Sequence, residues 1–547
     1  MFIVDGINNG IDTFCTLQGG GDVVKNLPSA FQFPEKVDEF YHVEETAGRY
    51  VVLASVDGKP APGTRPDLHF SPTGTAPKRS FEPDVIKRRV ITHSSAGPSR
   101  GSKEGSVNGS ILMADLAVEF TNVLDVADSV RSFGPSAKLC KTDVRSAYRN
   151  LPVRPDLVHL QCSEWRGILR ADLCLGFGVA SGPFTFEQFA MAIHYVLQRD
   201  LDEALGVGAT AVHHYLDDCI IICRDIVASD RAYDIMVATY CRLGVPLSME
   251  KTEKTVTVTD FLGIVVDAEA QCLRYPADKT AEVLAELRRL QSGATPTKLQ
   301  LLSLLGKLGF ADIVFPLARP FVSELYRLSH SVSKDYHHVK LSGRAHGDVA
   351  NWINVLTSAD GLPLLDRDID AATTAATARG DWACGDASGA GGYGFYDDTS
   401  FVAIEWDDTQ RSSFTGKLYA NSSTWQETAS MVAAGLRWLE LPGRGDMFVY
   451  FSDADNLRHN NDARRSKNAA VNGLLRLLAV RLIEARARFR VVWQSREDPM
   501  QCAADCLSRA DFDGFQTVVP GPHRARRRDS LHTGIGRLMA EAGAGWL

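Results

Sequence analysis

The stretch AVHHYLDDCIIIC (211–223) decides the fold, because it places two adjacent carboxylates between two strand-like runs. The β-branched and alternating residues on either side of YLDD predict two strands that meet at a tight turn. Asp217 and Asp218 then share that turn, where their like charges repel each other. Divalent cations remove such repulsion, so the stretch predicts either a metal site or a solvated turn, since Asp is a common turn residue.

A third carboxylate has a similar setting. Asp143 ends the strand-like run LCKTD (139–143), at the start of KTDVRSAY (141–148). Together with Asp217 and Asp218 it can complete a three-carboxylate site. Two Mg²⁺ ions held about 4 Å apart by such hard oxygen ligands suit an in-line phosphoryl displacement. We therefore expect Mg²⁺ as the cofactor, two ions per active site, with Mn²⁺ as an alternative.

Composition sets outer limits on the protein class. The chain has 547 residues, 45% hydrophobic and 23% charged, which predicts about three or four soluble globular domains. The formal net charge of −8 argues against a protein that coats nucleic acid indiscriminately. The eleven cysteines are scattered singly, which favours reduced thiols and an intracellular setting, cytoplasm, nucleus or both. Apolar runs are too short for a membrane span, so no membrane partner is expected.

Charge is distributed unevenly. Residues 1–70 are acidic and 71–103 are basic, while SSAGPSRGSKEGSVNGS (94–110) has the composition of an exposed loop. Two later segments, 279–307 and 481–496, are also basic and would suit a nucleic-acid track, although charge runs are more often solvated faces. Their cations are Lys279, Arg288, Arg289, Lys298, Lys307, Arg481, Arg486, Arg488, Arg490 and Arg496.

Hydrophobic periodicity predicts an α/β chain. Strand-like and helical patterns alternate over 111–275, and a more helical stretch follows, with Thr295 and Pro296 expected to cap and start its second helix. Residues 366–380 are polar and rich in Ala and Thr, so we expect a linker there. From 381 the pattern is a glycine-rich hairpin, a Trp-flanked helix, a strand, a helix and a strand. The chain after 515 is expected to be irregular and basic.

The first group of motifs resembles reverse transcriptases. YLDD is similar to their Tyr-x-Asp-Asp turn, and KTDVRSAYRNLPV (141–153) is similar to the motif with their first metal-binding aspartate. The resemblance implies that Asp143, Asp217 and Asp218 are the catalytic metal ligands. It also implies that Tyr148 stacks under the sugar of the incoming nucleotide and excludes a 2′-hydroxyl.

Further motifs extend this resemblance to nucleotide binding. GFGVASGPFTFEQF (176–189) resembles the segment that lies against the incoming nucleotide, with Phe177 on its sugar face. LSMEKTEK (247–254) implies that Lys251 lies near the departing pyrophosphate. SPTGTAPK (71–78) and KRRVITHSS (87–95) look like fingers strands, where Lys78 and Arg88 would meet the triphosphate. For these two cations a solvated basic loop is the alternative.

The third region resembles ribonuclease H. Four acids stand in its order of strand, helix, strand and late helix, and the resemblance implies that they hold two Mg²⁺ ions for hydrolysis of RNA in a hybrid. They are Asp386 in CGDASGAGGYG, Glu427 in TWQETAS, Asp453 in FSDADN and Asp505 in AADCLSR. Many relatives have a histidine just before the last aspartate, but SREDPMQCAAD (495–505) has none. Product release or proton transfer is therefore expected to differ here.

The resemblance implies an α/β (α+β) right-hand polymerase followed by a ribonuclease H-like domain. The expected parts are an N-terminal extension leading into the fingers (1–70), fingers and palm (71–275), thumb (276–345), connection or linker (346–380), ribonuclease H-like domain (381–515) and a basic irregular tail (516–547). NLPSAF (26–31), KRRVITHSSAGP (87–98), SVNGS (106–110) and SLLGKLGFADIVFPLARPF (303–321) resemble the DIRS/Ngaro group of tyrosine-recombinase retrotransposons. Gypsy-type elements and pararetroviruses are the nearest competitors.

The expected activity is RNA-directed and DNA-directed DNA synthesis combined with ribonuclease H cleavage. The expected partners are an RNA template, a DNA primer, an RNA–DNA hybrid and dNTPs, with a tyrosine recombinase or integrase on a separate chain. Two alternatives remain: a catalytically silent nucleic-acid-binding scaffold of the same fold, and an active polymerase with an inert ribonuclease H. The sequence does not specify the oligomeric state or the priming mechanism.

Overall fold

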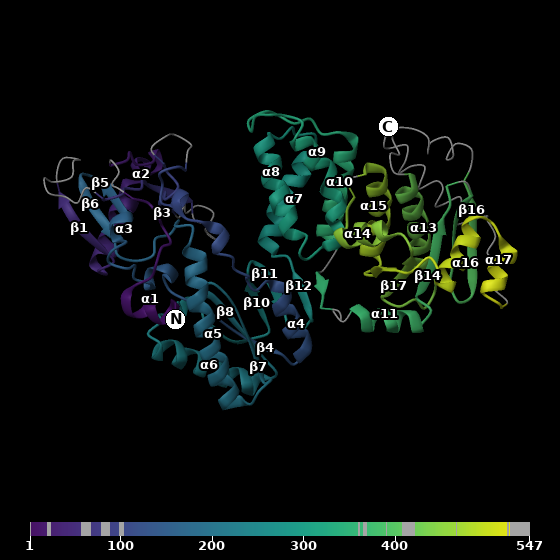
Figure 1. Ribbon diagram of the computed structural model, residues 1–547, viewed down its shortest axis with the longest axis horizontal. Helices are drawn as coiled ribbons and strands as arrows, with labels where there is room; N and C mark the ends of the chain where they lie inside the picture. Colours follow the sequence, from purple (N-terminus) through teal and green to yellow (C-terminus); the bar gives the residue numbers. More distant parts are fainter. Residues whose placement is uncertain are drawn as a thin grey trace. The chain divides into compact units, whose positions relative to one another are not determined.

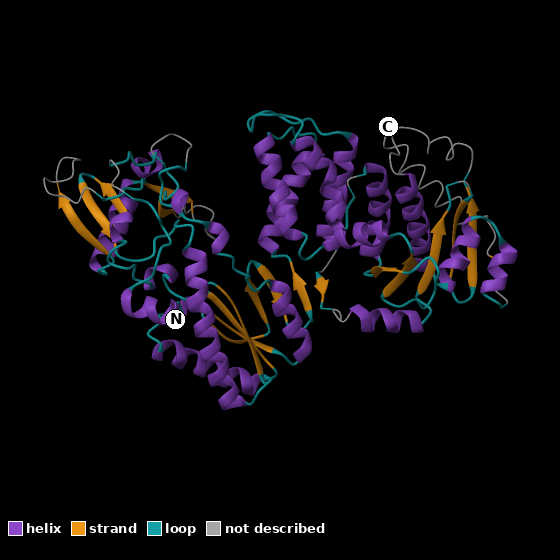
Figure 2. Ribbon diagram, in the orientation of Figure 1, coloured by secondary structure: helices purple, strands orange, loops and turns teal. Residues whose placement is uncertain are grey.

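The computed structural model describes residues 2–18, 23–55, 67–77, 88–97, 103–358, 361–364, 369–389, 391–406, 422–466, 468–521 and 524–525. The chain divides into two compact units, Met1–Gln271 and Cys272–Leu547. Figure 2 shows that both units contain helices and strands.

The first unit contains helices of 5 to 24 residues and several antiparallel sheets (Figure 1). Its helices are α1 (Phe2–Asn9), α2 (Pro28–Gln32), α3 (Pro34–Thr46), α4 (Val123–Phe133), α5 (Gly182–Leu205) and α6 (Ile226–Arg242), with 3-10 turns η1 (Asn108–Ser110), η2 (Met113–Asp115), η3 (Ala147–Asn150), η4 (Val158–Leu160) and η5 (Met249–Lys251). Its strands are β1 (Tyr50–Ser55), β2 (Thr73–Pro77), β3 (Arg88–Thr92), β4 (Lys138–Asp143), β5 (Cys162–Trp165), β6 (Ile168–Asp172), β7 (Thr210–Tyr215), β8 (Asp218–Cys223), β9 (Glu253–Val256), β10 (Val258–Phe261) and β11 (Ile264–Asp267).

The larger sheet has the strand order β7-β8-β4-β9, and all its pairs are antiparallel. Strand β8 is central, which explains its uninterrupted apolar run CIIIC, buried throughout. Helices cover both faces of this sheet. Adjacent residues of a strand point to opposite faces, and two adjacent residues of β7 contact two different helices. His213 of β7 contacts Ser129 of α4, whereas the next residue, His214, contacts His194 of α5.

The same unit contains two smaller sheets. The first has the order β1-β6-β5, and the second is the antiparallel pair β2–β3. Helix α3 packs near β1, where Tyr41 and Tyr50 meet edge to face with ring centroids 5.4 Å apart. Part of the segment expected to be an exposed loop (94–110) is buried: among its described residues, 94–97 and 103–110, Ser106 and Val107 are buried, and η1 follows them directly.

After a short strand at Cys272–Arg274, the second unit continues with helices and ends in a six-stranded sheet (Figure 1). Its helices are α7 (Ala277–Gln291), α8 (Lys298–Ala311), η6 (Pro316–Val322), α9 (Ser323–Ser329), α10 (Gly343–Ser358), α11 (Ile369–Ala378), α13 (Ser422–Leu439), α14 (Asp455–Ala463), α15 (Ala469–Glu484), α16 (Pro499–Ser508) and α17 (Phe512–Val518). Its strands are β12 (Cys272–Arg274), β13 (Leu362–Pro363), β14 (Trp382–Ala387), β15 (Gly392–Tyr396), β16 (Ser400–Glu405), β17 (Met447–Ser452), β18 (Arg488–Trp493) and β19 (Arg524–Ala525).

The six-stranded sheet is mixed, in the order β18-β17-β14-β15-β16-β19. Strands β14, β17 and β18 run parallel, and β15 is antiparallel to its neighbours β14 and β16. Alternate residues of β14 enter two different cores: Ala383 packs with α13 and α15, whereas Trp382 and Cys384 pack with α11 and α16. The sheet is therefore covered on both faces, and its strand ends are left for functional side chains.

Helix α8 begins two residues later than the sequence suggested. Its N-cap is Thr297, whose hydroxyl accepts a hydrogen bond from Gln300 N at 3.2 Å while Gln300 Oε1 accepts one from Thr297 N at 2.9 Å. This reciprocal capping box satisfies two backbone donors at once. The expectation that Thr295 caps this helix is therefore wrong.

The expected linker at 366–380 contains helix α11. Ala is the strongest helix former, and the small side chains of this segment allow close packing on the six-stranded sheet, where Ala376 is fully buried. Arg490 of β18 adds hydrogen bonds to Asp370 and Thr373. The low hydrophobicity that suggested a linker therefore reflects a small, closely packed interface.

Regular structure continues past the expected end of the last domain at 515. Helix α17 extends to Val518, and Arg524–Ala525 form a short parallel pair with β16. Residues 526–547, most of the expected basic tail, lie outside the described ranges. Among the described residues, no helix combines the length and the apolarity that crossing a bilayer requires.

The capping box yields a direct stability test. We expect Thr297→Ala to lower the free energy of unfolding of the second unit by about 1 kcal/mol, the usual value of an N-cap hydroxyl. Thr295→Ala, two residues away, is the matched control and should change it by less than about 0.5 kcal/mol. Urea denaturation followed by circular dichroism measures both values. Equal losses in the two variants would contradict the assignment of the cap.

Candidate functional site

The YLDD turn is the tip of the β7–β8 hairpin. Tyr215 pairs with Asp218, which leaves Leu216 and Asp217 as the two central residues. Leu216 has φ 52°, a left-handed conformation that costs a non-glycine residue about 1 kcal/mol or more. Its backbone N–H donates to the Glu187 carboxylate of α5 at 3.3 Å. The buried Glu187 also contacts His214 of β7 at 3.0 Å, so α5 holds both the turn and the strand that leads into it.

Strand register brings the third carboxylate to the same place. Asp143, the last residue of β4, pairs directly with Asp218, and Val144 N donates to Asp217 O at 3.0 Å. The three acids therefore gather at one end of the sheet. Burial, together with the charges of Asp218 and Asp143, raises the pKa of Asp217 to about 6. Burial also raises the pKa of Asp218.

Cations and hydroxyls partly compensate this negative charge. Lys251 Nζ lies 2.8 Å from Asp143 Oδ2, and Ser248 Oγ donates to Asp143 Oδ1 at 2.9 Å. The hydrogen bond to Asp143 raises the pKa of Lys251, so its ammonium group stays charged. Lys251 was expected near a pyrophosphate; the structure places it on the carboxylate itself. Ser248 was missed, and its only sequence signal is its place in LSMEKTEK.

Two aromatic residues lie beside these acids. Tyr148 of η3 and Phe177 stack with ring centroids 5.4 Å apart and planes 27° apart, and Phe177 is exposed. Gly182 at the start of α5 lies against the Tyr148 ring; a Cβ there would be 3.1 Å from Cε2. Burial raises the pKa of Tyr148 to about 12, so the hydroxyl stays protonated. Tyr148 and Phe177, the two residues predicted to contact the sugar, therefore lie against each other.

The two cations expected at a triphosphate have different outcomes. Arg88 lies on β3, where Nε donates to Thr75 Oγ1 at 3.0 Å and the guanidinium lies 4.0 Å from the Phe33 ring centroid. Lys78 lies outside the described residues. The role of either residue in nucleotide binding stays a prediction.

The second unit contains a tighter acidic cluster. Asp386 at the end of β14, Glu427 of α13 and Asp453 after β17 place carboxylate oxygens within 4.8 Å of one another. Asp386 and Glu427 are 6% and 9% exposed, and Glu427 Oε2 has no hydrogen-bond partner among the described residues. Burial raises the pKa of Glu427 well above its ordinary value, and Asp386 and Asp453 add to this. A divalent cation fits this donor set, because it supplies both the missing partner and the missing charge.

Within the described ranges, the cluster formed by Asp386, Glu427 and Asp453 is the only one with three oxygens this close. Asp143, Asp217 and Asp218 share a sheet end without reaching that mutual distance. Their hard oxygen donors still suit Mg²⁺, but Lys251 occupies part of the space around Asp143. Metal binding there would require the Lys251 side chain, 59% exposed, to move away.

Asp505 lies at the edge of the second cluster. It is on α16, where Arg509 donates to its Oδ1 at 2.7 Å, and it stands outside the group of three. Its charge nevertheless raises the pKa of Asp386, after the larger effect of burial. Arg496, which sequence reasoning treated only as part of a basic run, donates from Nε to Asp453 Oδ2 at 2.8 Å while its side chain is 86% exposed.

The two basic segments proposed as a nucleic-acid track are largely paired within the protein. Lys307 contacts Glu282 and Glu286 of α7. In the other segment Arg481 pairs with Glu484, Arg488 with Asp446 and Arg490 with Asp370. Their excess positive charge therefore gives weak support for nucleic-acid binding.

Comparison with known proteins assigns the first site to a class. Residues 109–266 match the family model described as reverse transcriptase (RNA-dependent DNA polymerase), and this range contains Asp143, Asp217 and Asp218. The chain therefore contains a reverse transcriptase domain. No curated protein gives a significant match to the sequence.

Solved structures match the fold over most of the chain. A foamy viral protease-reverse transcriptase, in a form named dRH with double-stranded DNA, is 13% identical with a TM-score of 0.51, over 88% of this chain and 73% of that chain. The foamy viral protease-reverse transcriptase with an RNA/DNA hybrid is 14% identical with a TM-score of 0.49, over 88% and 56%. The first match confirms the predicted fold class, a right-hand polymerase of mixed α/β structure.

The buried Glu427 generates a prediction about pH and metal. A raised pKa means that ionised Glu427 destabilises the metal-free fold, so its unfavourable effect grows as the pH rises from about 4.5 through the raised pKa. Glu427→Gln should therefore stabilise the metal-free protein at neutral pH by about 1 kcal/mol or more, and this gain should shrink toward pH 4.5.

Thermal unfolding in EDTA and in Mg²⁺ measures both effects. We expect Glu427→Gln to lose most of the Mg²⁺-dependent rise in Tm of the second unit's transition, whereas Asp455→Asn, a nearby exposed acid, should retain it. An unchanged Mg²⁺ response in Glu427→Gln would exclude the cluster as a metal site.

Proposed function

We propose that this protein is an RNA-directed and DNA-directed DNA polymerase with ribonuclease H activity. One observation carries the polymerase assignment: the β4 and β7–β8 register places Asp143, Asp217 and Asp218 at one sheet end, inside the range that matches the reverse transcriptase family. The same sheet end carries the stacked Tyr148 and Phe177 on neighbouring segments. We propose these five residues as the polymerase site.

The proposed reaction is attack of a primer 3′-hydroxyl on the α-phosphate of a dNTP, with pyrophosphate as the leaving group. Two magnesium ions held by the three aspartates would compensate charge on the phosphoryl oxygens. Tyr148 and Phe177 would hold the sugar, and Lys251 would supply a positive charge for the departing pyrophosphate. Catalysis would be mainly positioning and charge compensation.

We propose that the second cluster hydrolyses the RNA strand of a hybrid. Asp386, Glu427 and Asp453 offer hard oxygen ligands, and Glu427 Oε2, which has no hydrogen-bond partner within the described ranges, supports metal binding there. Asp505 would join from α16. Activation of water by a bound divalent ion is the chemistry such a site supplies.

The proposal assigns substrates and parts to the chain. An RNA template, a DNA primer, their hybrid and dNTPs are the proposed substrates, recognised by backbone shape because a polymerase must accept any sequence. We propose fingers and palm at 71–275, thumb at 276–345, connection at 346–380 and the ribonuclease H-like domain at 381–515. The DIRS/Ngaro relationship, a separate recombinase or integrase, and an intracellular location are proposals that rest on the sequence motifs and on the scattered cysteines.

One observation favours a second candidate, a polymerase with an inert ribonuclease H. The exposed Arg496 pairs with Asp453 and would compete with a metal ion for that carboxylate. The histidine usual near the last aspartate is also missing from SREDPMQCAAD. A catalytically silent scaffold is disfavoured, because Lys251 and Arg496 offset only part of the repulsion among the carboxylates of the two sites, and bound divalent cations would offset more of it.

Primer extension on a defined RNA template with Mg²⁺ tests the polymerase. We expect Asp217→Asn and Asp218→Asn each to reduce the extension rate by about a thousandfold or more, because both acids act as one unit in the site. Asp234→Asn, an exposed acid on α6, is the control and should extend like the wild type. Wild-type protein that binds the template–primer but adds no nucleotide would refute the polymerase assignment.

Cleavage of a labelled RNA–DNA hybrid tests the second site separately. Glu427→Gln should lose RNA cleavage while keeping primer extension, since the two clusters lie on different sheets. Retained cleavage in Glu427→Gln would show that the site is misassigned. A wild-type protein that extends primers without cleaving RNA would establish the second candidate instead.

A further inference from the structure

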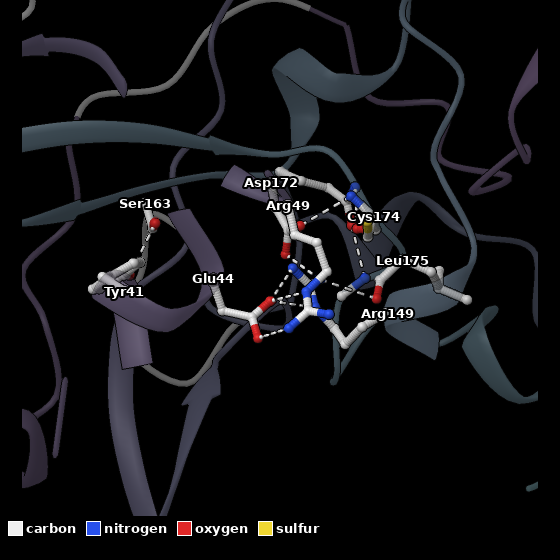
Figure 3. Close-up of polar contacts among 10 residues, drawn as sticks. Tyr41, Glu44, Arg49, Arg149, Ser163, Asp172, Cys174 and Leu175 are labelled. Atoms are coloured by element: carbon white, nitrogen blue, oxygen red, sulfur yellow. Dashed lines mark hydrogen bonds and ion pairs between the residues drawn. The ribbon is translucent and has the colours of Figure 1, made fainter. Parts of the chain in front are cut away.

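A buried charge network joins three segments of the first unit. We call it the Arg149 cluster: Glu44 of α3, Arg49 before β1, Arg149 of η3 and Asp172 of β6. In Figure 3 dashed lines join the Glu44 carboxylate to the guanidinium groups of Arg49 and Arg149, and Arg149 also to Asp172. Arg149 Nη2 lies 2.9 Å from Glu44, and Nη1 lies 2.7 Å from Asp172.

The cluster is almost fully enclosed. The side chains of Arg149, Asp172 and Glu44 are 4%, 7% and 9% exposed. The Tyr50 ring covers the Arg149 guanidinium, with 5.4 Å between Cζ and the ring centroid. Burial alone would lower the pKa of Arg149, but Asp172, Tyr50 and Glu44 raise it, so Arg149 stays charged. A buried pair rarely adds net stability, although loss of one partner is costly. The main effect of such a cluster is therefore to fix the geometry of the segments that it joins.

Arg149 fixes the two segments that carry the proposed sugar-contacting pair. It directly follows Tyr148 in η3, and its Nη1 also donates to Leu175 O at 3.4 Å, two residues before Phe177. Asp172 Oδ1 accepts from Cys174 N at 3.0 Å, and Leu175 N donates to Leu151 O at 2.9 Å. The Arg149 guanidinium therefore connects the segment that contains Tyr148 to the segment that contains Phe177.

The backbone before Tyr148 needs such an anchor. Ser146 and Ala147 both have positive φ, 63° and 29°. Non-glycine residues keep these conformations only where the surrounding structure determines them. On one side Asp143 begins the segment at the carboxylate site, and on the other Arg149 ends it in the buried cluster. A shift of Arg149 would let this strained segment relax and move the Tyr148 ring.

We propose that Arg149 is a positioning residue for sugar selection: through Glu44 and Asp172 it sets the distance between Tyr148 and Phe177. This inference rests on the proposed polymerase function and adds a residue to it. Arg149 touches neither substrate nor metal in this account; it acts through Tyr148. Helix α3 is thereby coupled to nucleotide choice by the Glu44–Arg149 contact.

The chain offers a matched control in the same region. Arg170 of β6 is also buried, pairs with Glu45 of α3 and lies 4.4 Å from the Tyr41 ring centroid. It makes no contact with η3 among the described interactions, and its side chain donates to Trp165 O and Ile168 O instead. Arg170→Lys therefore removes similar interactions without reaching Tyr148.

The experiment measures kcat and KM for single dNTP and rNTP additions on an RNA template–primer. We expect Arg149→Lys to lower the dNTP-over-rNTP selectivity by about tenfold, mainly through KM, while Arg170→Lys leaves it unchanged. Tyr148→Ala should lower selectivity by itself. In that background Arg149→Lys should cause no further loss, because the ring it positions is gone.

Glu44→Gln covers the case in which Arg149→Lys does not fold, since it keeps the Arg149–Asp172 pair, and it should give a smaller loss of selectivity. Wild-type selectivity in the folded variants, with only a lower Tm that matches Arg170→Lys, would overturn the inference. Additive losses in the double variant would also overturn it. If the wild-type protein extends no primer, the proposed polymerase function is refuted, and the inference about Arg149, which rests on it, is refuted too. Failure of the Arg149 inference alone would leave primer extension by the wild type intact.

Discussion

Repulsion between buried carboxylates at the ends of strands is the constraint on which both sites depend. Asp217 has a pKa raised to about 6 by burial, and Glu427 has one raised well above its ordinary value, in each case with two further acids nearby. A fold gains nothing by enclosing such groups unless cations compensate them. The compensation differs between the two sites. Lys251 donates a hydrogen bond to Asp143 at the first site, whereas at the second site one Glu427 oxygen has no partner in the described chain.

The two sheets produce these sites by the same geometric means. In the first, antiparallel register sets Asp143 opposite Asp218, and the strained Leu216 presents Asp217 at the hairpin tip. In the second, the ends of the parallel strands β14 and β17 meet, and α13 adds Glu427 from one face. Helices on both faces of each sheet keep these ends fixed. The Arg149 cluster extends the same principle to the aromatic pair, because it ties strained backbone to a buried charge network.

The sequence predicted the strands and the carboxylate motifs, but it missed one helix cap, one helix and one contact that depends on tertiary packing. The runs around YLDD predicted β7 and β8, and Asp143 was found because its motif is distinctive. The contact of Lys251 with Asp143 could not be predicted, because it depends on how η5 follows the sheet. Thr297 was missed as a cap because Thr295–Pro296 offers the same signal two residues earlier. The segment containing Ala376 suggested a linker because its sequence has no stripe of large hydrophobic residues. Its small side chains nevertheless pack closely in the core.

The same limit explains the basic segments. Their sequence charge suggested a nucleic-acid track, yet Lys307, Arg488 and Arg490 find acidic partners inside the fold.

The most direct test of the central claim is anomalous diffraction from crystals of the protein grown with template–primer and Mn²⁺. The account predicts Mn²⁺ bound by Asp143, Asp217 and Asp218, with Lys251 displaced, and Mn²⁺ bound by Asp386, Glu427 and Asp453. Carboxylates that bind no metal, with Lys251 still on Asp143 and Arg496 still on Asp453, would contradict it.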